Sequence, residues 1–216
     1  MFKSESPMRH ILAKDLSPKD TLEILTGGVG PRPIALVSTL SKDGKRNLAP
    51  FSFFNAFGSN PPIVVFSPAR KTRDGSFKDT YTNLLQTKEC VVQAVTYAMA
   101  KQVNICSAEF APGVDEFIES GLTPIDSLKV KPPRVKESPF QMECVLKQMM
   151  SLGEKPGSGN LAVCEVLVFH IAESVYKDGI IHPDLMDLVA RNGGHFYTRA
   201  KGNALFELEK PPLPPS

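Results

Sequence analysis

The feature that most constrains the fold of this chain is a pair of long apolar runs in its second half. Residues 139–152 and 161–175 are each far longer than a typical strand. The segment between them, Gly153-Glu154-Lys155-Pro156-Gly157-Ser158-Gly159, is rich in turn-forming residues. This pattern predicts two long antiparallel strands joined by a flexible hairpin loop. Long paired strands with few helices favour a barrel.

Shorter strands are predicted in the first half of the chain. The β-rich run 33–40 ends at Ser41-Lys42-Asp43-Gly44-Lys45, where Asp43-Gly44 suggests a hairpin whose return arm is 47–52. Pro61-Pro62 opens a further strand over 63–67, because proline is tolerated at the start of a strand but not in its middle. A buried strand is expected over 89–96. Together with the long pair, six strands are predicted.

Helices are predicted to be few and short. A polar, basic loop over 68–77 leads into a helix that starts at 78–80, with Asp79 or Thr80 as its N-cap. Two further helical pieces are expected over 98–107 and 114–120, the second ending at Gly121. The proline-rich tail 210–216 is expected to be extended or disordered. We expect one mainly β domain over residues 1–216, with its core between about 25 and 200.

The composition is that of a globular protein with a small-molecule partner. The chain has 42% hydrophobic and 22% charged residues, and its net charge of +2 is spread along the chain. This gives no electrostatic footprint for a nucleic acid or a membrane surface. No apolar stretch approaches the roughly 18 to 20 residues that span a bilayer, and the first residues lack a signal-peptide core. A cytoplasmic location is therefore expected.

Several familiar site patterns are excluded. Gly28-Val29-Gly30 resembles the start of a dinucleotide fingerprint, but it precedes a strand, and prolines occupy the place where a helix would begin; it is interpreted as a turn. The four histidines are scattered, so no metal site is expected. The four cysteines form no Cys-x-x-Cys pair and are expected to be buried thiols, with Cys106, alone outside a strand, the one to test for reactivity.

The remaining candidate for chemistry is the basic loop that runs into a helix at Arg70 to Thr80. Unpaired amides, the helix dipole and lysine or arginine charge together suit a dianionic phosphate. Each charge-assisted hydrogen bond there contributes about 1.5 to 3 kcal/mol. The alternative is a solvated basic loop without a ligand. Which of Arg70, Lys71 and Arg73 faces the phosphate is left open.

Several segments, taken in order and spacing, carry a resemblance to a known family. They are Gly30-Pro31-Arg32-Pro33-Ile34-Ala35-Leu36-Val37-Ser38-Thr39, Asp43-Gly44, Asn47-Leu48-Ala49-Pro50-Phe51-Ser52-Phe53-Phe54-Asn55, Asn60-Pro61-Pro62, Lys78-Asp79-Thr80 with Asn83, Val114-Asp115-Glu116-Phe117, Gly121-Leu122-Thr123, Glu143-Cys144 and Arg191-Asn192-Gly193-Gly194 with Tyr197. The chain resembles the flavin reductase-like family, with its FMN-binding split barrel, and especially the flavoredoxin-like branch.

The resemblance implies a six-stranded antiparallel Greek-key split barrel with a few short peripheral helices. It further implies a homodimer, with FMN in a groove to which both subunits contribute. The segment from Pro50 to Asn55 would meet the flavin ring, largely through backbone groups, with Ser38 and Asn47 on adjoining strands, and Ser67 with the basic loop would hold the phosphate. The implied cofactor-binding residues are Ser38, Asn47, Pro50, Phe51, Ser52, Phe53, Phe54, Asn55, Ser67, Arg70, Lys78, Asp79 and Thr80.

The implied activity is flavin-mediated oxidoreduction with NADH or NADPH as the electron donor. The cofactor supplies the redox chemistry, so no catalytic side chain is required. Two alternatives stay open. The first is an FMN electron carrier or sensor that lacks nicotinamide activity and passes electrons to a partner protein. The second is a split barrel that has lost its cofactor. At least one of Phe51, Phe53 and Phe54 is expected in the core, and strand alternation is expected to separate the role of Phe54 from that of the other two.

Overall fold

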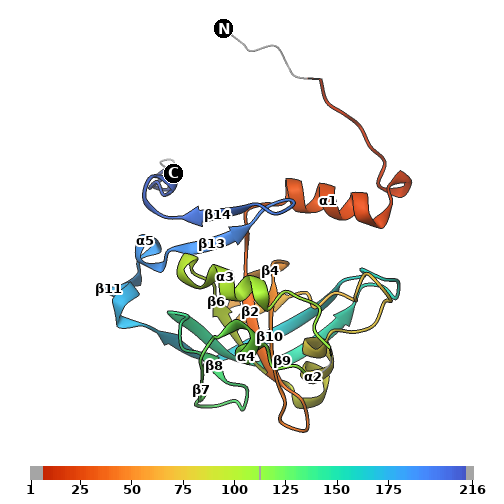
Figure 1. The fold of residues 1–216 in the computed structure, drawn as a ribbon. Helices are drawn as coiled ribbons and strands as arrows, with labels where there is room; N and C mark the ends of the chain where they lie inside the picture. Colours follow the sequence, from red (N-terminus) through yellow and green to blue (C-terminus); the bar gives the residue numbers. More distant parts are fainter. Residues whose placement is uncertain (1–6, 112, 213–216) are drawn as a thin grey trace.

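The centre of the protein is one antiparallel sheet of seven strands in the order β3-β2-β6-β9-β10-β5-β4 (Figure 1). The structure is a computed structural model that describes residues 7–111 and 113–212. The strands are β2 (Ala35–Leu40), β3 (Arg46–Phe51), β4 (Phe54–Ser59), β5 (Pro62–Phe66), β6 (Glu89–Ala94), β9 (Phe140–Ser151) and β10 (Asn160–Ile171). The predicted mainly β fold is confirmed. The seventh strand is β4, which lies in the aromatic segment that was not predicted as a strand.

The two edges of this sheet meet at a single place. Strands β3 and β4 stand at opposite ends of the strand order, yet only Ser52 and Phe53 separate them in the chain. The sheet must therefore curve until its edges approach at these two residues. The backbone amide of Ser67, just after β5, donates to the carbonyl of Phe53 at 2.9 Å and holds the junction in place. The result is a barrel with its edges joined at one end.

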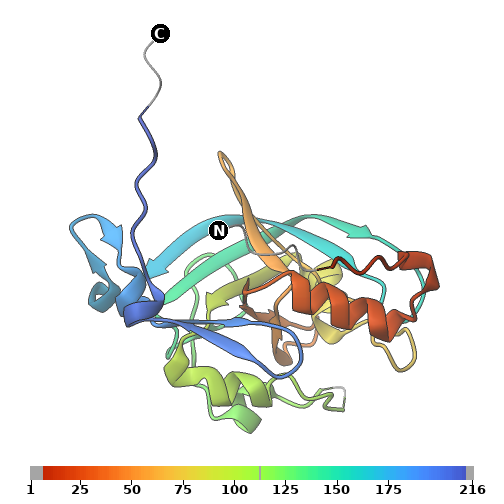
Figure 2. The ribbon, with the colours of Figure 1, turned by 90° about the horizontal axis from the view of Figure 1, so that it is seen from above.

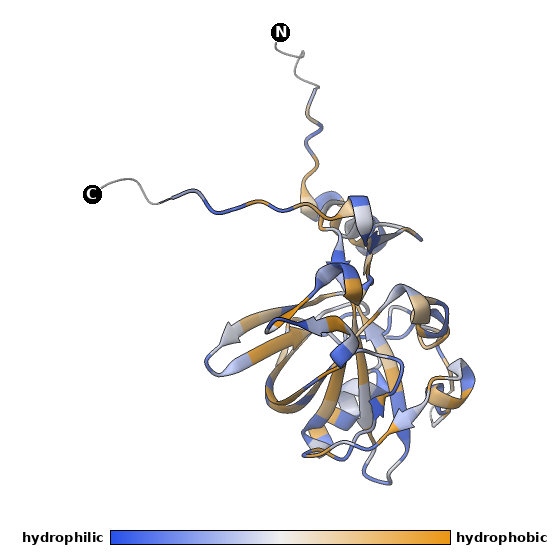
Figure 3. Ribbon diagram, turned by 90° about the vertical axis from the view of Figure 1, so that its left-hand side faces the viewer, coloured by the Kyte–Doolittle hydropathy of each residue, from blue (hydrophilic) through white to orange (hydrophobic). Residues whose placement is uncertain are grey.

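Strand β2 is buried on both faces because it lies between two apolar clusters. Ala35 and Val37 belong to the cluster inside the barrel, whereas Leu36 belongs to a second cluster outside it. Helices α3 (Ala100–Ile105) and α4 (Glu116–Ser120) cover that outer side. This explains a run of consecutive apolar residues in place of alternation. Figure 3 shows the apolar colouring concentrated along the barrel strands.

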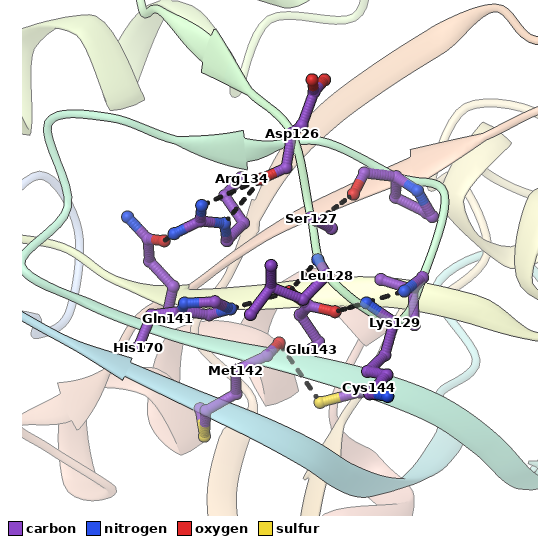
Figure 4. Close-up of polar contacts among 12 residues, drawn as sticks. Asp126, Ser127, Leu128, Lys129, Arg134, Gln141, Met142, Glu143, Cys144 and His170 are labelled. Carbon is purple, nitrogen blue, oxygen red and sulfur yellow. Dashed lines mark hydrogen bonds and ion pairs between the residues drawn. The ribbon is translucent and has the colours of Figure 1, made fainter.

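A buried carboxylate anchors a long connection to the sheet (Figure 4). The side chain of Glu143 on β9 is fully buried. Its oxygens accept hydrogen bonds from the backbone amides of Leu128 at 2.7 Å, Lys129 at 2.6 Å and Val130 at 3.2 Å, and one lies 2.7 Å from Nε2 of His170. Burial alone would raise the pKa of Glu143, but these hydrogen bonds outweigh it and lower the pKa.

The helix α1 (Pro18–Gly28) was not predicted. Its start is built by Ser17, whose hydroxyl accepts from the amide of Asp20 at 3.1 Å, with proline in the first turn. The helix ends at Gly28, so the Gly28-Val29-Gly30 segment terminates a helix and starts none. No residue of α1 is buried. Figure 1 shows it above the barrel, beside the hairpin of β13 and β14.

The remaining elements surround the barrel (Figure 2). Strands β1 (Arg32–Pro33), β13 (Leu188–Arg191) and β14 (Tyr197–Ala200) form a three-stranded sheet. Two small two-stranded pairs join β7 (Pro124–Ile125) to β8 (Arg134–Val135) and β11 (Tyr176–Lys177) to β12 (Ile180–Ile181). The other helices are α2 (Asp79–Thr87), α5 (Pro183–Met186), η1 (Ala13–Asp15), η2 (Tyr97–Met99), η3 (Glu173–Val175) and η4 (Gly202–Ala204). Within the described ranges, no helix has the length and apolarity to cross a membrane.

Two local predictions need correction or completion. The N-cap of α2 is Lys78, with extended backbone, so Asp79 and Thr80 are the first helical residues and not its cap. Cys106 lies outside the strands as expected, but only 3% of it is exposed, and burial raises the pKa of its thiol. It is therefore not a reactive thiol. Residues 205–212 form no regular element, and the last four residues of the predicted extended tail lie outside the described ones.

Candidate functional site

The aromatic segment expected to meet a flavin ring lies at the junction of the two sheet edges. Phe51 closes β3 and is buried in the core, with its ring centroid 5.3 Å from that of Phe66. Phe54 opens β4 and packs against the same core. The expectation that strand alternation separates these two rings is wrong, because the chain turns at Ser52 and Phe53. Core packing is confirmed for Phe51.

Phe53 is the ring of this segment that reaches solvent, with 43% of the residue exposed. The guanidinium carbon of Arg32 lies 5.9 Å from its ring centroid. Arg32 is held by the carbonyls of Thr26 at 2.7 Å, Asn192 at 3.1 Å and Val29. Burial, and then the charge of Arg191, lower the pKa of this guanidinium. Arg32 was missed as a candidate, although it lies within the Gly30-to-Thr39 motif.

Arg32 has one polar atom without a partner. Its Nε is buried and makes no hydrogen bond within the described ranges. A buried donor next to an exposed aromatic ring suits a polar ligand that presents an acceptor there.

The loop over 68–77 is ordered by its own contacts. Nη1 of Arg70 donates to the carbonyl of Gly75 at 3.0 Å, and its guanidinium lies 4.0 Å from the ring centroid of Phe77. That ring is stacked on Tyr81 of α2, with centroids 4.0 Å apart. The backbone amide of Arg70 donates to the carbonyl of Ser158 at 2.9 Å, which ties this loop to the hairpin loop between β9 and β10.

The three basic side chains of this loop have different environments. Arg70 is engaged as just described, and Arg73 lies 3.3 Å from Asp74 with 72% of its side chain exposed. Hydrogen bonds from Ser76 lower the pKa of Asp74 to about 2, so its carboxylate is charged across the neutral range. Lys71 is half-buried and close enough to Lys78 to affect its titration. Lys71 is thus the loop cation best placed beside Lys78.

Lys78 stands at the start of α2 and close to the aromatic segment that is expected to meet a flavin. Its Nζ lies 6.0 Å from the ring centroid of Phe51. Burial lowers the pKa of this ammonium group; Glu109 acts in the opposite direction, and Lys71 adds to the lowering. Among the residues that the structure describes, Lys78 forms no ion pair and its ammonium makes no hydrogen bond. A half-buried cation beside a second cation is stabilised by a bound anion.

The first turn of α2 is attached to the sheet by a buried polar network. Nδ2 of Asn47 donates to Oγ1 of Thr39 at 3.2 Å and to Oγ1 of Thr80 at 3.0 Å. Asn83 of α2 also donates to Oγ1 of Thr39, at 3.0 Å. The amides of Asp79 and Thr80 at the helix start have no partner in the described part of the chain and point along the positive end of the helix dipole.

Ser67 and Asn160 form the other wall of this region. The Ser67 hydroxyl accepts a hydrogen bond from the backbone amide of Asn160 at 3.3 Å. The side-chain Nδ2 of Asn160 donates to the carbonyl of Pro68 at 2.9 Å. Oδ1 of Asn160 is buried and finds no donor in residues 7–111 and 113–212. Asn160 was not a candidate, since its position at the start of a predicted strand gave no functional signal.

The structure places some of the expected residues near one another. The backbone amide of Ser67 donates to the carbonyl of Phe53, and Nζ of Lys78 lies 6.0 Å from the ring centroid of Phe51. Ser52 lies with Phe53 between β3 and β4. Ser38 differs, because it is fully buried and its hydroxyl donates to the carbonyl of Pro133. Pro50 is half-buried and Asn55 is exposed on β4.

Two surface hollows can be compared with the expected site. One of about 210 Å³ lies beside α2 and is lined in part by Asn47 and Asp79. Another, of about 410 Å³, lies between α3 and the β13–β14 hairpin and includes none of the expected residues. Neither hollow is lined by residues 50–55.

The comparisons with known proteins assign the family. A model described as the flavin reductase like domain matches residues 28–193. The chain belongs to the flavin reductase-like family. This confirms the resemblance carried by the motifs between Gly30 and Tyr197.

Several known proteins are similar to the chain over nearly its whole length. Nitrilotriacetate monooxygenase component B from Bacillus cereus shares 35% identity at a TM-score of 0.88, with 94% of this chain and 100% of that one covered. The 2-nitrobenzoate 2-nitroreductase NbaA of Pseudomonas fluorescens shares 28% identity at a TM-score of 0.84, covering 96% and 99%. An uncharacterised protein of Aquifex aeolicus is 37% identical over 191 residues, covering 88% of this chain and 95% of its own. The two solved structures therefore share the fold of this chain.

Proposed function

We propose that this protein binds FMN at the junction of the two sheet edges and reduces it with NADH or NADPH. The observation that carries the proposal is Lys78, a half-buried cation without an ion pair in the described residues, next to the free amides that begin α2. Family membership supplies the flavin. A phosphate is the anion that such a combination of ammonium charge and helix amides prefers.

The residues near the junction have the chemical groups that FMN requires. Lys78, with the amides of Asp79 and Thr80, would hold the phosphate, and Lys71 would add charge. The hydroxyls of Ser52 and Ser67 would reach the ribityl chain and its phosphate, and Pro50 to Asn55 would run along the ring. The buried Oδ1 of Asn160 and Nε of Arg32, both unpartnered in the part of the chain that the structure describes, provide one acceptor and one donor beside this region.

The chain's own contribution to the reaction would be binding and orientation. Bound FMN would supply the redox chemistry, as acceptor of the hydride that the nicotinamide donates. Phe53, exposed and flanked by Arg32, would form one boundary of the ring site and keep a cationic group near it. Asn47, Arg70 and Phe77 would keep the helix start and the loop in place, so that little order is lost on binding.

The decisive experiment is anaerobic titration of the purified protein with NADH and NADPH while the flavin spectrum is followed. Bleaching of the 450 nm region, together with steady-state nicotinamide oxidation, supports the reductase. A yellow protein that reacts with neither nicotinamide supports the carrier alternative. A protein that neither carries FMN nor quenches its fluorescence contradicts the proposal as a whole.

The proposal includes a homodimer. Supporting it, α1 leaves Leu22, Ile24 and Leu25 between 44% and 50% exposed, and Phe57 on the edge strand β4 is 69% exposed. Exposed apolar helices and open sheet edges are usually covered in the native assembly. Sedimentation velocity at micromolar concentration should give twice the chain mass of 23.6 kDa. Truncation of residues 1–29 should shift the protein toward monomer.

The proposal also covers the cellular location and the domain organisation of the protein. We place the reaction in the cytoplasm, because all four cysteines are free and buried, as is usual in a reducing compartment. We also treat the chain as one domain, because the matched residues 28–193 include both barrel edges and strands β1 and β13 of the three-stranded sheet. Limited proteolysis should leave this range as a single resistant fragment.

A further inference from the structure

The hollow between α3 and the β13–β14 hairpin has the chemistry of a second binding site. Its volume is about 410 Å³, within the size range of small-molecule sites. Apolar surface is provided by Ala100 and Val189 and by the rings of Tyr97 and Tyr197. Polar groups come from Lys101, Asn104, Arg191 and His195.

The charged groups of this hollow are all basic. Lys101 and Arg191 line it, His195 stands beside them, and no carboxylate is among its lining residues. In the residues that the structure describes, neither Lys101 nor Arg191 forms an ion pair or a side-chain hydrogen bond. By contrast, the nearby Arg199 is paired with Asp187 at 2.6 and 2.7 Å. The hollow therefore retains uncompensated positive charge and free guanidinium donors.

The two tyrosines offer ring surface beside this charge. Tyr97 is 55% and Tyr197 is 43% exposed. The guanidinium carbon of Arg191 lies 4.6 Å from the ring centroid of Tyr197, which holds the planar fork beside the ring. Arg199, itself fixed by Asp187, lies 3.9 Å from the ring centroid of Tyr97. A flat ring that carries an anionic group matches both features at once.

The walls of the hollow are fixed to the barrel by backbone hydrogen bonds. The amide of Tyr97 donates to the carbonyl of Asp187 at 2.8 Å, and the amide of Val189 donates to the carbonyl of Val95 at 3.1 Å. Figure 1 shows the β13–β14 hairpin next to α3. Because these bonds join the segment that follows β6 to the start of β13, the site is formed before any ligand arrives.

We propose that this hollow binds a small aromatic anion, with Arg191 and Lys101 taking the charged group and Tyr97 and Tyr197 contacting the ring. The site lies close to the flavin-facing edge, since Arg191 pairs in register with Arg32, whose guanidinium lies 5.9 Å from the Phe53 ring. The proposal concerns binding alone and stands without flavin chemistry.

The chain allows a site-specific test, because it has no tryptophan and only four tyrosines. The full-length, flavin-free protein is labelled with 3-fluorotyrosine, and its ¹⁹F resonances are assigned with single Tyr→Phe variants. Titration with benzoate should shift Tyr97 and Tyr197 and leave Tyr81 and Tyr176 in place. Benzamide, the neutral counterpart, should bind at least tenfold more weakly. Phenyl phosphate in a parallel titration shows whether phosphate or carboxylate is the preferred anion.

Variants assign the contacts. Arg191→Ala should raise the benzoate dissociation constant at least tenfold. Lys101→Ala should raise it at least threefold, and this variant on α3 tests the site even if the first variant disturbs the hairpin. The control Lys42→Ala removes the same charge from an exposed turn and should leave the constant within twofold. Equal binding of benzamide, equal shifts at all four tyrosines, or no shift with either anion would overturn the proposal. Tyr81 of α2, stacked on Phe77 of the loop proposed to hold the FMN phosphate, reports the proposed flavin site separately in the same spectrum.

Discussion

Asn47 on β3 donates a hydrogen bond from Nδ2 to Oγ1 of Thr80, at 3.0 Å, and so joins the sheet edge to the first turn of α2. Thr39 completes the network by accepting from both Asn47 and Asn83. The motif indicated Asn47 as a cofactor ligand. In the structure the donors of its side chain are engaged within the protein, which indicates that it acts on a ligand through the position of α2.

Replacing Asn47 by alanine should therefore change stability and affinity together. Loss of two buried hydrogen bonds should lower the free energy of unfolding by about 1 to 3 kcal/mol, and the less firmly held helix start should weaken FMN binding several-fold. Urea unfolding and FMN fluorescence titration measure the two effects. Asn203→Ala, at an exposed position, is the control. Wild-type stability of the Asn47 variant would contradict the structural role.

Lys78→Ala should weaken FMN binding at least tenfold and leave the fold intact. The variant removes the proposed charge-assisted hydrogen bond to the FMN phosphate, for which about 1.5 to 3 kcal/mol is expected. Arg73→Ala removes the same charge from the same loop, but from a side chain that is exposed and paired with Asp74, so affinity should change little. Fluorescence quenching of FMN gives both dissociation constants. Equal constants for the Lys78 variant and wild type would remove this residue from the site.

Phe51 and Phe53 should respond differently to the same substitution. Phe51→Ala opens a cavity in the core and should cost roughly 3 to 5 kcal/mol of stability. Phe53→Ala removes an exposed ring and should leave the melting temperature nearly unchanged while weakening FMN binding. Thermal unfolding of the flavin-free protein, paired with FMN titration, separates the two. Strong destabilisation by the Phe53 variant would show that its ring is structural.

Glu143 should make the fold sensitive to acid. Its pKa is lower in the folded than in the unfolded state, so the stabilisation is present above the ordinary value of 4.5 and is lost as the pH falls through the folded value. Glu143→Gln should lower the free energy of unfolding by roughly 1.5 to 3 kcal/mol at neutral pH, because it replaces a buried carboxylate that accepts hydrogen bonds from three backbone amides. Urea unfolding at pH 7, 5, 4 and 3 should show a shallower acid dependence for the variant. Parallel curves for variant and wild type would argue against this residue.

The strands were predictable because their local signals agree with their tertiary role. Asp43-Gly44 marks the turn between β2 and β3, with Gly44 at φ 77°, and the long runs became β9 and β10. The basic loop and the start of α2 were also located correctly. The start of α1 carried an equally clear signal in Ser17, Pro18 and Asp20, which the sequence interpretation did not use.

Side-chain partners were not predictable, because they depend on segments far apart in the chain. Asn160 reaches Ser67 and Pro68 across the sheet, and the hydroxyl of Ser38 reaches Pro133. Nothing in the neighbouring residues of either side chain indicates these contacts. Phe54 shows a related limit. The prediction assumed one continuous strand, but the chain turns at Ser52 and Phe53, so Phe51 and Phe54 face the same core.

The junction of the two sheet edges also sets an order of assembly. The hairpin of β4 and β5 forms from neighbouring residues, but its other side pairs with β10, and Ser67 meets Asn160 across a separation of 93 residues. Contacts of such long range form late and slowly. As the chain leaves the ribosome, this hairpin has no lateral support until residues 160–171 have been synthesised. The proposed binding of FMN at this edge would therefore follow translation of most of the polypeptide and would not guide its early folding.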